Sequence, residues 1–305
     1  MQTENSNPIK ERILITGGSS FLGGYLVKEA EKRFDVTATY YQNLPIYDGC
    51  HWQFLDLSIM DQIEKCVTDI QPNIIIHNAA ITNVDTSEKN KTQTLKINTH
   101  ASKKIAQIAH DMGTRVIYIS TDLVFNGVEA AYGEDSAPAP LNHYGWSKWQ
   151  GELAIKENCS DYIVIRPSII FGPPVISGTS FSEWMIHSWR KSKATKLFSD
   201  QFRTPIFAGN LADAIFEAAK IEFTGTLHIG GSESIDRYRF GLLLAQHLGA
   251  DINIIEKSTM QDVQLTGNRP ADVSLDITLA KQILNTRLYD CREGILKAYP
   301  NKQVS

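Results

Sequence analysis

The strongest constraint in this sequence is a short apolar run that stops at a glycine-rich turn and continues into a helical pattern. The run at 12–16 (RILIT) predicts a buried strand, and 15–24 (ITGGSSFLGG) holds the turn. A helix is predicted over 21–33. Small side chains at such a junction let backbone N–H groups and the helix N-terminus approach a pyrophosphate. The N-terminal segment therefore favours a parallel α/β fold with a dinucleotide site.

The same alternation continues through the first half of the chain. Strands are predicted at 35–40, 73–77, 114–120 and 161–166, and helices at 56–70, with Ser58 as N-cap, 91–112 and 144–158. Alternating strands and helices imply parallel pairing with right-handed crossovers. We therefore expect a Rossmann-like, doubly wound sheet, in which ligands bind beyond the carboxyl ends of the strands.

The regular alternation is lost after about Gly172. Later helices are predicted at 181–191, 211–220 and 237–249, with a strand at 225–231. We expect a dinucleotide-binding domain over 1–172, joined by segments that return from later in the chain. A smaller substrate-binding lobe is expected mainly over 173–305.

Charge and composition argue against several classes of protein. The net charge is -4 and there is no large basic block, which disfavours nucleic-acid binding. No apolar run of about 20 residues is present, so we expect no membrane span, and the polar N-terminal segment lacks a secretory pattern. The cysteines are scattered and the histidines are not clustered. We expect four reduced thiols in a cytoplasmic protein and no metal site.

The glycine turn carries information about the cofactor. Gly17, Gly18 and Gly23 are suitably placed, but Ser20 stands where a GxxGxxG pattern has its middle glycine. Taken alone, the segment also fits an ordinary strand–helix turn. Dinucleotide folds that prefer NAD place an acidic residue at the end of the second strand, where this chain has Tyr40. No carboxylate there repels a 2′-phosphate and no arginine binds one, so NADP(H) is favoured over NAD(H).

A second feature, YGWSKWQGE at 144–152, predicts acid–base chemistry. Positions four apart share one face of a helix, so Tyr144 and Lys148 point into one cleft. A neighbouring ammonium lowers the pKa of a phenol, ordinarily about 10. Tyr144 then gives a proton to a carbonyl oxygen as hydride reaches its carbon. Thr121, just beyond the strand at 114–120, is placed to hold the same oxygen. Taken singly, the three also fit a packed aromatic, a solvated helix charge and a strand-end hydroxyl.

Several segments, in this order, resemble the extended short-chain dehydrogenase/reductase superfamily, most closely the dTDP-4-dehydrorhamnose reductases. The most specific are STDLVFNG and YGWSKWQGE. The matching segments span about residues 12–285: TGGSSFLG (16–23), FLDLS (54–58), HNAAITNVDTSE (77–88), KIN (96–98), ISTDLVFNG (119–127), PLNHYGWSKWQGE (140–152), IRPSIIFG (165–172), DQFRTP (200–205) and NRPADVSLD (268–276).

The resemblance implies reduction of a nucleotide-linked 4-keto-6-deoxy sugar, most closely dTDP-4-dehydrorhamnose to dTDP-rhamnose. It implies that Thr121, Tyr144 and Lys148 are catalytic, with Asn98 organising a proton path, and that Arg203, Thr204 and Arg269 bind substrate. It also implies these cofactor-binding residues: Gly17, Ser20, Phe21, Leu22, Gly23, Tyr40, Asp56, Leu57, Asn78, Ala79, Ala80, Tyr144 and Lys148.

Alternatives stay open at this point. The chain also resembles the β subunit of methionine adenosyltransferase, a regulatory protein, and another nucleotide-sugar reductase or an epimerase would share the same catalytic residues. Arg203 and Arg269 also fit surface ion pairs. Trp184 and Trp189 fit core packing better than stacking on a ligand, and Asp122 fits a plain turn as well as an orienting role. The oligomeric state is open, with a homodimer as one option.

Overall fold

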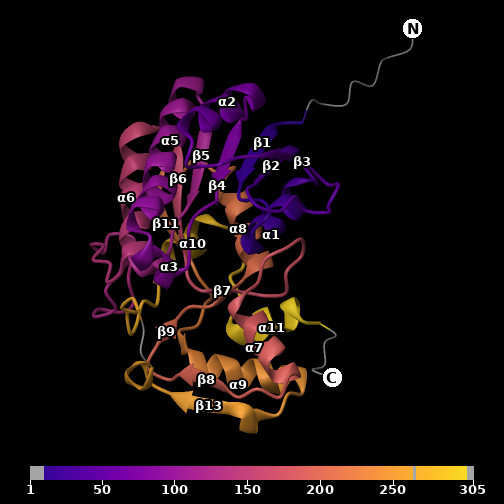
Figure 1. The fold of residues 1–305 in the computed structure, drawn as a ribbon, viewed down its shortest axis with the longest axis vertical. Coiled ribbons are helices and arrows are strands. Elements are labelled where there is room, and N and C mark those ends of the chain that lie inside the picture. Colours follow the sequence, from indigo (N-terminus) through magenta and orange to yellow (C-terminus); the bar gives the residue numbers. More distant parts are fainter. Residues whose placement is uncertain (1–9, 264–265, 301–305) are drawn as a thin grey trace.

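The computed structural model describes residues 10–263 and 266–300, and its centre is a seven-stranded parallel sheet. The strand order is β11-β6-β5-β4-β1-β2-β3 (Figure 1). The strands are β1 (Arg12–Thr16), β2 (Asp35–Tyr40), β3 (His51–Phe54), β4 (Ile74–His77), β5 (Arg115–Ile119), β6 (Tyr162–Pro167) and β11 (Gly225–Ile229). Every pairing in the sheet is parallel, so all strands end at one edge.

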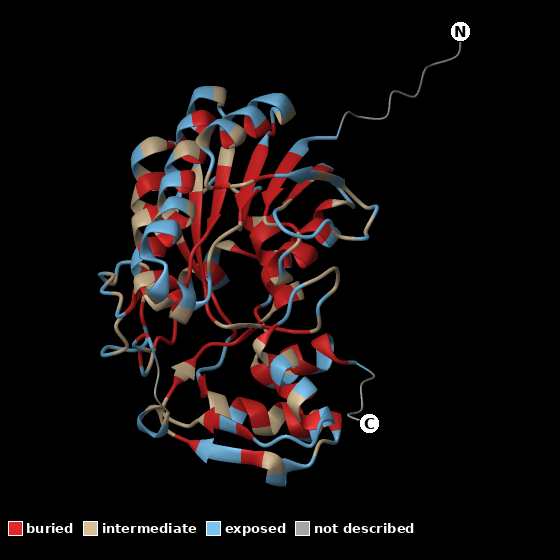
Figure 2. Ribbon diagram, in the orientation of Figure 1, coloured by how far each residue is buried: buried red, intermediate tan, exposed pale blue. Residues whose placement is uncertain are grey.

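Helices cover both faces of this sheet. One apolar cluster joins α1 (Phe21–Ala30) and α8 (Ala208–Ala218) to the sheet, and a second joins α2 (Met60–Ile70), α5 (Ala101–Met112) and α6 (His143–Asn158) to its other face. Side chains along β1 alternate between the two faces of the sheet: Ile13 and Ile15 belong to the first cluster and Leu14 belongs to the second. Apart from the edge strand β3, the strands are accordingly mostly buried on both sides, as Figure 2 shows.

A smaller lobe lies below the sheet in Figure 1 and has its own apolar core, which includes Met185, Trp189 and Leu244. Its paired strands are β7 (Ile170–Phe171) with β10 (Ile206–Phe207), β8 (Thr195–Phe198) with β13 (Ile255–Ser258), and β9 (Phe202–Arg203) with β12 (Ile235–Asp236). Its helices are α7 (Phe181–Arg190), α9 (Arg237–Leu248) and α11 (Cys291–Ala298). Because α8, β11 and α10 (Thr278–Ile283) return to the sheet, we propose a division near residue 172 with those segments assigned to the first domain.

The prediction of a doubly wound parallel fold is confirmed, with local corrections. The N-cap prediction at Ser58 is wrong: the carboxylate of Asp56 accepts the Ser58 N–H at 2.8 Å, and α2 begins at Met60 after Ile59. The helix predicted at 91–112 contains α4 (Lys91–Leu95), a π-helical turn at Lys96–His100, and α5. Strand β3 was not predicted, since a mostly exposed edge strand has no continuous apolar run. The remaining short elements are α3 (Val84–Lys89) and 3₁₀ turns at Asp122–Val124, Ile252–Ile254 and Met260–Asp262.

Candidate active site

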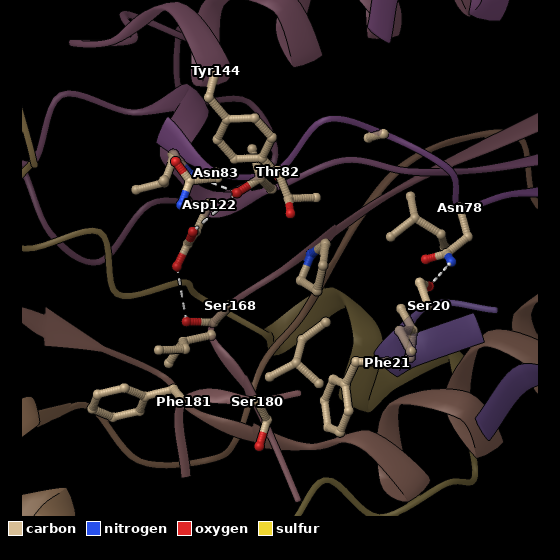
Figure 3. Close-up of a pocket in the computed structure, with 18 of the residues that line it drawn as sticks. Ser20, Phe21, Asn78, Thr82, Asn83, Asp122, Tyr144, Ser168, Ser180 and Phe181 are labelled. Atoms are coloured by element: carbon tan, nitrogen blue, oxygen red, sulfur yellow. Dashed lines mark hydrogen bonds between the residues drawn. The ribbon is translucent and has the colours of Figure 1, made fainter. Parts of the chain in front are cut away.

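A cavity of about 850 Å³, here called the central cavity, opens at the carboxyl edge of the sheet and reaches the lobe. Segments that follow β1, β4, β5 and β6 line it, because parallel strands all end at this edge. Figure 3 shows Tyr144 and Asp122 on one side of the cavity, with Ser20 and Asn78 on the other. The following predicted site residues line it: Gly17, Ser20, Phe21, Leu22, Asn78, Ala79, Ala80, Thr121, Tyr144, Lys148 and Arg203.

The glycines of the turn allow neighbouring backbone segments to pack closely against it. Gly17 has a φ of +67°, and a Cβ atom there would lie 2.8 Å from Ala79 Cα. A Cβ atom at Gly23 would lie 2.1 Å from the Gly17 carbonyl oxygen, so the helix packs directly on the turn. Gly23 itself does not line the central cavity. Phe21 and Leu22 begin α1 at the cavity wall, and a helix start that faces a cavity suits a phosphate.

Ser20 fits this turn without backbone strain. Its φ of -86° and ψ of 174° are ordinary extended values, so the glycine usual at this position is not needed here. The Ser20 hydroxyl accepts the Gly23 N–H at 3.1 Å and an N–H of the Asn78 amide at 2.9 Å. Ser20 therefore caps α1 and ties it to the segment after β4.

A second cavity of about 470 Å³, here called the edge cavity, shares Gly17, Ala79 and Ala80 with the first. It brings together Tyr40 and the pair Asp56–Leu57, which the resemblance assigns to the cofactor. Its lining contains no lysine or arginine. The two cavities form a path along the sheet edge that fits an extended dinucleotide.

Tyr144 and Thr121 form the polar wall of the central cavity. Burial raises the pKa of Tyr144 above its ordinary value, the negative charge of Asp122 adds to this effect, and a hydrogen bond with Thr121 opposes it. The prediction that Lys148 lowers the pKa of Tyr144 is therefore wrong for this structure. A phenol that stays protonated at neutral pH suits a proton donor. The Thr121 hydroxyl donates to Asp122 Oδ1 at 3.3 Å, and Ser168 donates to Asp122 Oδ2 at 3.0 Å.

Lys148 is 1 % exposed, and its Nζ lies 3.9 Å from the centroid of the Tyr118 ring. Burial lowers the pKa of Lys148 to about 7, although the carboxylate of Glu152 opposes this. Glu152 is itself buried and pairs with Arg166 at 2.6 Å. The Lys148 amine is therefore held beside an aromatic face and titrates near neutrality.

Asn98 lies behind the cavity wall, within the π-helical turn. Its side-chain amide donates to the Ile81 carbonyl at 3.0 Å and to the Ser147 hydroxyl at 2.9 Å. Asn98 thus braces the turn of α6 that lies between Tyr144 and Lys148. The proton path expected of it stays a proposal.

The residues predicted to bind substrate are not all brought together. The Arg203 guanidinium donates to the carbonyls of Ala271 at 3.1 Å and Pro270 at 3.0 Å, so the lobe itself uses most of its donors. Thr204 is buried and accepts the Leu275 N–H at 3.4 Å, outside the central cavity. Arg269 donates to Asp85 at 3.0 Å. The alternative of a surface ion pair fits Arg269, whose partner Asp85 is 42% exposed, although Arg269 also lines a further cavity. It does not fit Arg203, which is 3 % exposed and lies 3.9 Å from the buried carboxylate of Asp122.

This further cavity, of about 230 Å³ and here called the lobe cavity, reveals an arginine that the sequence analysis missed. It is lined by Phe181, Trp184, Lys196, Leu197, Phe198, Gln201, Arg237 and Arg269. Phe181 and Arg237 line the central cavity as well. Trp184 stacks on Phe181, whereas Trp189 is packed in the lobe core.

Arg237 is the most unusual side chain of this region. Its Cζ lies 4.3 Å from the centroid of the Phe181 ring. In the described part of the chain, Arg237 Nε and Gln201 Nε2 are buried side-chain nitrogens without a hydrogen-bond partner. Burial lowers the pKa of Arg237 to about 9, and the charge of Arg203 adds to this effect. In sequence Arg237 is an unremarkable first residue of a helix, so only its place between two cavities and its unpartnered Nε identify it.

Comparison with known proteins identifies the family. The model of the RmlD substrate binding domain matches residues 11–303. The chain belongs to this family. RmlD-type proteins lie within the extended short-chain dehydrogenase/reductase superfamily, as the sequence motifs predicted.

Named relatives resemble this RmlD-type chain over most of its length. The probable low-salt glycan biosynthesis reductase Agl14 of Haloferax volcanii is 28% identical over 268 residues, 87% of this chain and 89% of the relative. The dTDP-4-dehydrorhamnose reductase of Aggregatibacter actinomycetemcomitans is 25% identical over 304 residues, 94% and 99% of the two chains. Methionine adenosyltransferase 2 subunit beta of Pongo abelii is 28% identical over 286 residues, 90% and 82%.

Solved structures agree with the RmlD-type fold. The dTDP-4-dehydrorhamnose reductase of Bacillus anthracis, in complex with NADP, has a TM-score of 0.86 at 26% identity and covers 96% of this chain and 99% of its own. A hypothetical dTDP-4-dehydrorhamnose reductase from Sulfolobus tokodaii has a TM-score of 0.82 at 31% identity, with 93% and 98% covered. The protein is an NAD(P)-dependent oxidoreductase, and the comparisons support a nucleotide-linked sugar as its substrate.

Over 10–263 and 266–300, no cluster of three or more His, Cys, Asp or Glu side chains has the arrangement to hold a metal ion. Within the same residues no helix is long and apolar enough to cross a bilayer.

Proposed function

We propose that the protein reduces dTDP-4-dehydrorhamnose to dTDP-rhamnose, with NADP(H) preferred over NAD(H). One observation carries the proposal: a single cavity joins the glycine turn, the Tyr144–Thr121 wall and Arg237 at the entrance to the lobe cavity. A ligand that extends from the glycine turn to the lobe cavity fits best if it has a reacting group beside Tyr144 and a negative charge beside Arg237. It also has an aromatic or planar end beside Trp184. A nucleotide diphosphate sugar has these three parts in this order.

The residues divide the chemistry between them. When bound, the nicotinamide cofactor supplies the hydride that reduces the sugar carbonyl carbon. Tyr144 gives its phenolic proton to the carbonyl oxygen, so the product is an alcohol. The Thr121 hydroxyl holds the same oxygen as negative charge develops on it. Lys148 lies in the same wall and supplies a positive charge below about pH 7. General acid assistance by a positioned group contributes about 10²–10⁴ in rate.

The preference for NADP(H) rests on the end of β2. Tyr40 places a phenol where NAD-preferring folds have a carboxylate, so a 2′-phosphate meets no repulsion from it. Because no lysine or arginine lines the edge cavity, we expect a modest preference and measurable activity with both cofactors. A higher kcat/KM with NADH than with NADPH contradicts this part of the proposal.

The test is turnover of a panel of nucleotide-linked 4-keto sugars with NADPH and with NADH. We expect consumption of NADPH with dTDP-4-dehydrorhamnose and formation of dTDP-rhamnose in the product analysis. A product epimerised without net consumption of NADPH indicates an epimerase. If the pure, folded protein turns over none of the sugars and instead captures a methionine adenosyltransferase in stoichiometric amount, the regulatory alternative replaces this proposal. That alternative is favoured by one finding, the 28% identity to the β subunit.

Cellular location and assembly are part of the same proposal. Cys50, Cys66, Cys159 and Cys291 are all free thiols, which supports a reducing compartment, and we propose the cytoplasm. We also propose a homodimer, and light scattering of the purified protein tests it.

A further inference from the structure

A row of buried hydrogen bonds connects the glycine turn to the helix that carries Tyr144 and Lys148. Thr16 Oγ1 lies 2.8 Å from His77 Nδ1, and His77 Nε2 lies 3.0 Å from Ser102 Oγ. The Ser102 hydroxyl donates to the Asn98 carbonyl at 2.8 Å. Thr16, His77 and Ser102 have no exposed surface, and Asn98 is 1 % exposed. The chemistry described above uses none of the first three side chains.

The direction of every bond in this row follows from Thr16. Its hydroxyl oxygen accepts two backbone N–H groups, those of Asn78 and Ala79, both at 3.1 Å. Both lone pairs are then used, so the hydroxyl proton must point at His77 Nδ1. A neutral imidazole that accepts at Nδ1 carries its proton on Nε2 and donates to Ser102. The row therefore runs one way, from Thr16 through His77 and Ser102 to the Asn98 carbonyl.

His77 cannot change its charge without breaking this row. A proton on Nδ1 would face the Thr16 oxygen, whose lone pairs are both occupied. Burial lowers the pKa of His77 to about 3, and the positive charge of Lys148 adds to this effect. His77 is thus fixed in one tautomer and is neutral across the physiological range.

The far end of the row is fastened to α6. The Tyr118 hydroxyl donates to the Asn98 carbonyl at 3.2 Å and lies 3.4 Å from the Lys148 carbonyl oxygen. The Asn98 amide donates to the Ser147 hydroxyl, which donates in turn to the Tyr144 carbonyl at 2.8 Å. Asn98 also lies in a π-helical turn, a rare geometry that often accompanies functional sites. The carbonyl groups of Tyr144 and Lys148 are therefore both linked to Asn98, Tyr144 through the Ser147 hydroxyl and Lys148 through the Tyr118 hydroxyl.

We propose that His77 is a positioning residue, which fixes the Tyr144–Lys148 turn of α6 relative to the glycine turn by holding the Asn98 peptide. The inference rests on the proposed function, in which those two turns present the proton donor and the hydride donor to one carbonyl. A misplacement of about 1 Å in such a pair costs about 10²-fold in rate. A polar residue that only filled the core would affect stability alone.

Three variants separate these roles. His77→Phe keeps a ring in the core but removes both nitrogens, and Ser102→Ala breaks the next link. The control is His228→Phe, because His228 is equally buried, in β11, and contacts no member of the row: its Nδ1 lies 3.0 Å from the Tyr132 carbonyl oxygen and its Nε2 lies 3.4 Å from Arg166 Nη1. If His77→Phe does not fold, Ser102→Ala carries both measurements below.

Hydrogen–deuterium exchange tests the coupling without any turnover. His77→Phe and Ser102→Ala should both speed amide exchange in the segments that contain Asn98 and the Tyr144–Lys148 turn, while His228→Phe leaves those segments unchanged. Unaltered exchange there in a folded His77→Phe or Ser102→Ala protein overturns the proposal. Since no substrate is needed, this result stands even if the assigned reaction is wrong.

Kinetics then test the consequence for catalysis. We expect each of the two variants to lower kcat by about 10-fold to 10²-fold, with the KM for cofactor unchanged. The double variant should be no slower than the slower single one, because both changes break the same row. Multiplying effects would show that the two residues act independently and not through one row, and a wild-type kcat in His77→Phe would show that His77 only fills the core; either result overturns the proposal.

Discussion

The Nζ atom of Lys148 lies 3.9 Å from the centroid of the Tyr118 ring, and both side chains are buried beneath α6. An aromatic face replaces part of the hydration that a buried ammonium loses. The replacement is incomplete, since the pKa of Lys148 still falls to about 7. This relationship holds the amine in the wall of the central cavity, on the same helix face as Tyr144.

Tyr144→Phe should lower kcat by about 10²–10⁴-fold, because it removes the proton donor. The ring remains, so the packing and the affinity for NADPH should be preserved. Steady-state kinetics and a fluorescence titration with NADPH measure the two effects. Tyr162→Phe, on β6 and away from the central cavity, is the matched control and should behave as wild type. Wild-type turnover in Tyr144→Phe would remove the role we assign to this phenol.

Lys148 should make stability depend on pH. Between about pH 7 and the ordinary lysine pKa, the unfolded chain binds a proton that the folded chain lacks, so the free energy of unfolding rises with pH. The rise from this one group is at most about 1.4 kcal/mol per pH unit. Chemical denaturation of wild type and Lys148→Met from pH 6 to pH 9 measures it as a difference. An identical pH dependence in the two proteins would contradict a lowered pKa for Lys148.

Arg237→Met should weaken substrate binding without weakening the fold. Loss of a charge-assisted contact costs about 1.5–3 kcal/mol, which corresponds to about 10-fold to 10²-fold in the KM for the nucleotide sugar. The free energy of unfolding without substrate should stay the same or rise, because a partly buried guanidinium with a buried, unpartnered Nε is removed. Arg239→Met, two residues further along α9 with a side chain 75% exposed, is the control. An unchanged KM in Arg237→Met would exclude this arginine from the substrate site.

Ser20→Ala should destabilise the protein by about 1 kcal/mol, since it removes the N-cap of α1. Ser20→Gly should cost less, because glycine is itself tolerated at an N-cap. Urea denaturation of the two variants gives the comparison. Equal stability of Ser20→Ala and wild type would show that the bonds to Gly23 and Asn78 contribute nothing.

The sequence by itself determined the elements and their order. The run at 12–16, the glycine turn after it and the spacing of Tyr144 and Lys148 are local patterns, and each reports a local geometry: a buried strand, a tight turn, one face of a helix. Parallel strands separated by helices leave few topologies, so a shared sheet edge for the glycine turn and Thr121 followed from the order alone.

Only the tertiary structure decided which charges are buried and what they contact. Arg237 and Arg239 look alike in the sequence, yet one lies at the junction of two cavities and the other in solvent. Arg203, which was expected to bind substrate, lines the central cavity and also donates to carbonyls nearly 70 residues away. The pKa of Tyr144 rises where the helix spacing predicted a fall. Burial and long-range contacts set these properties, and the pattern of neighbouring residues does not encode them.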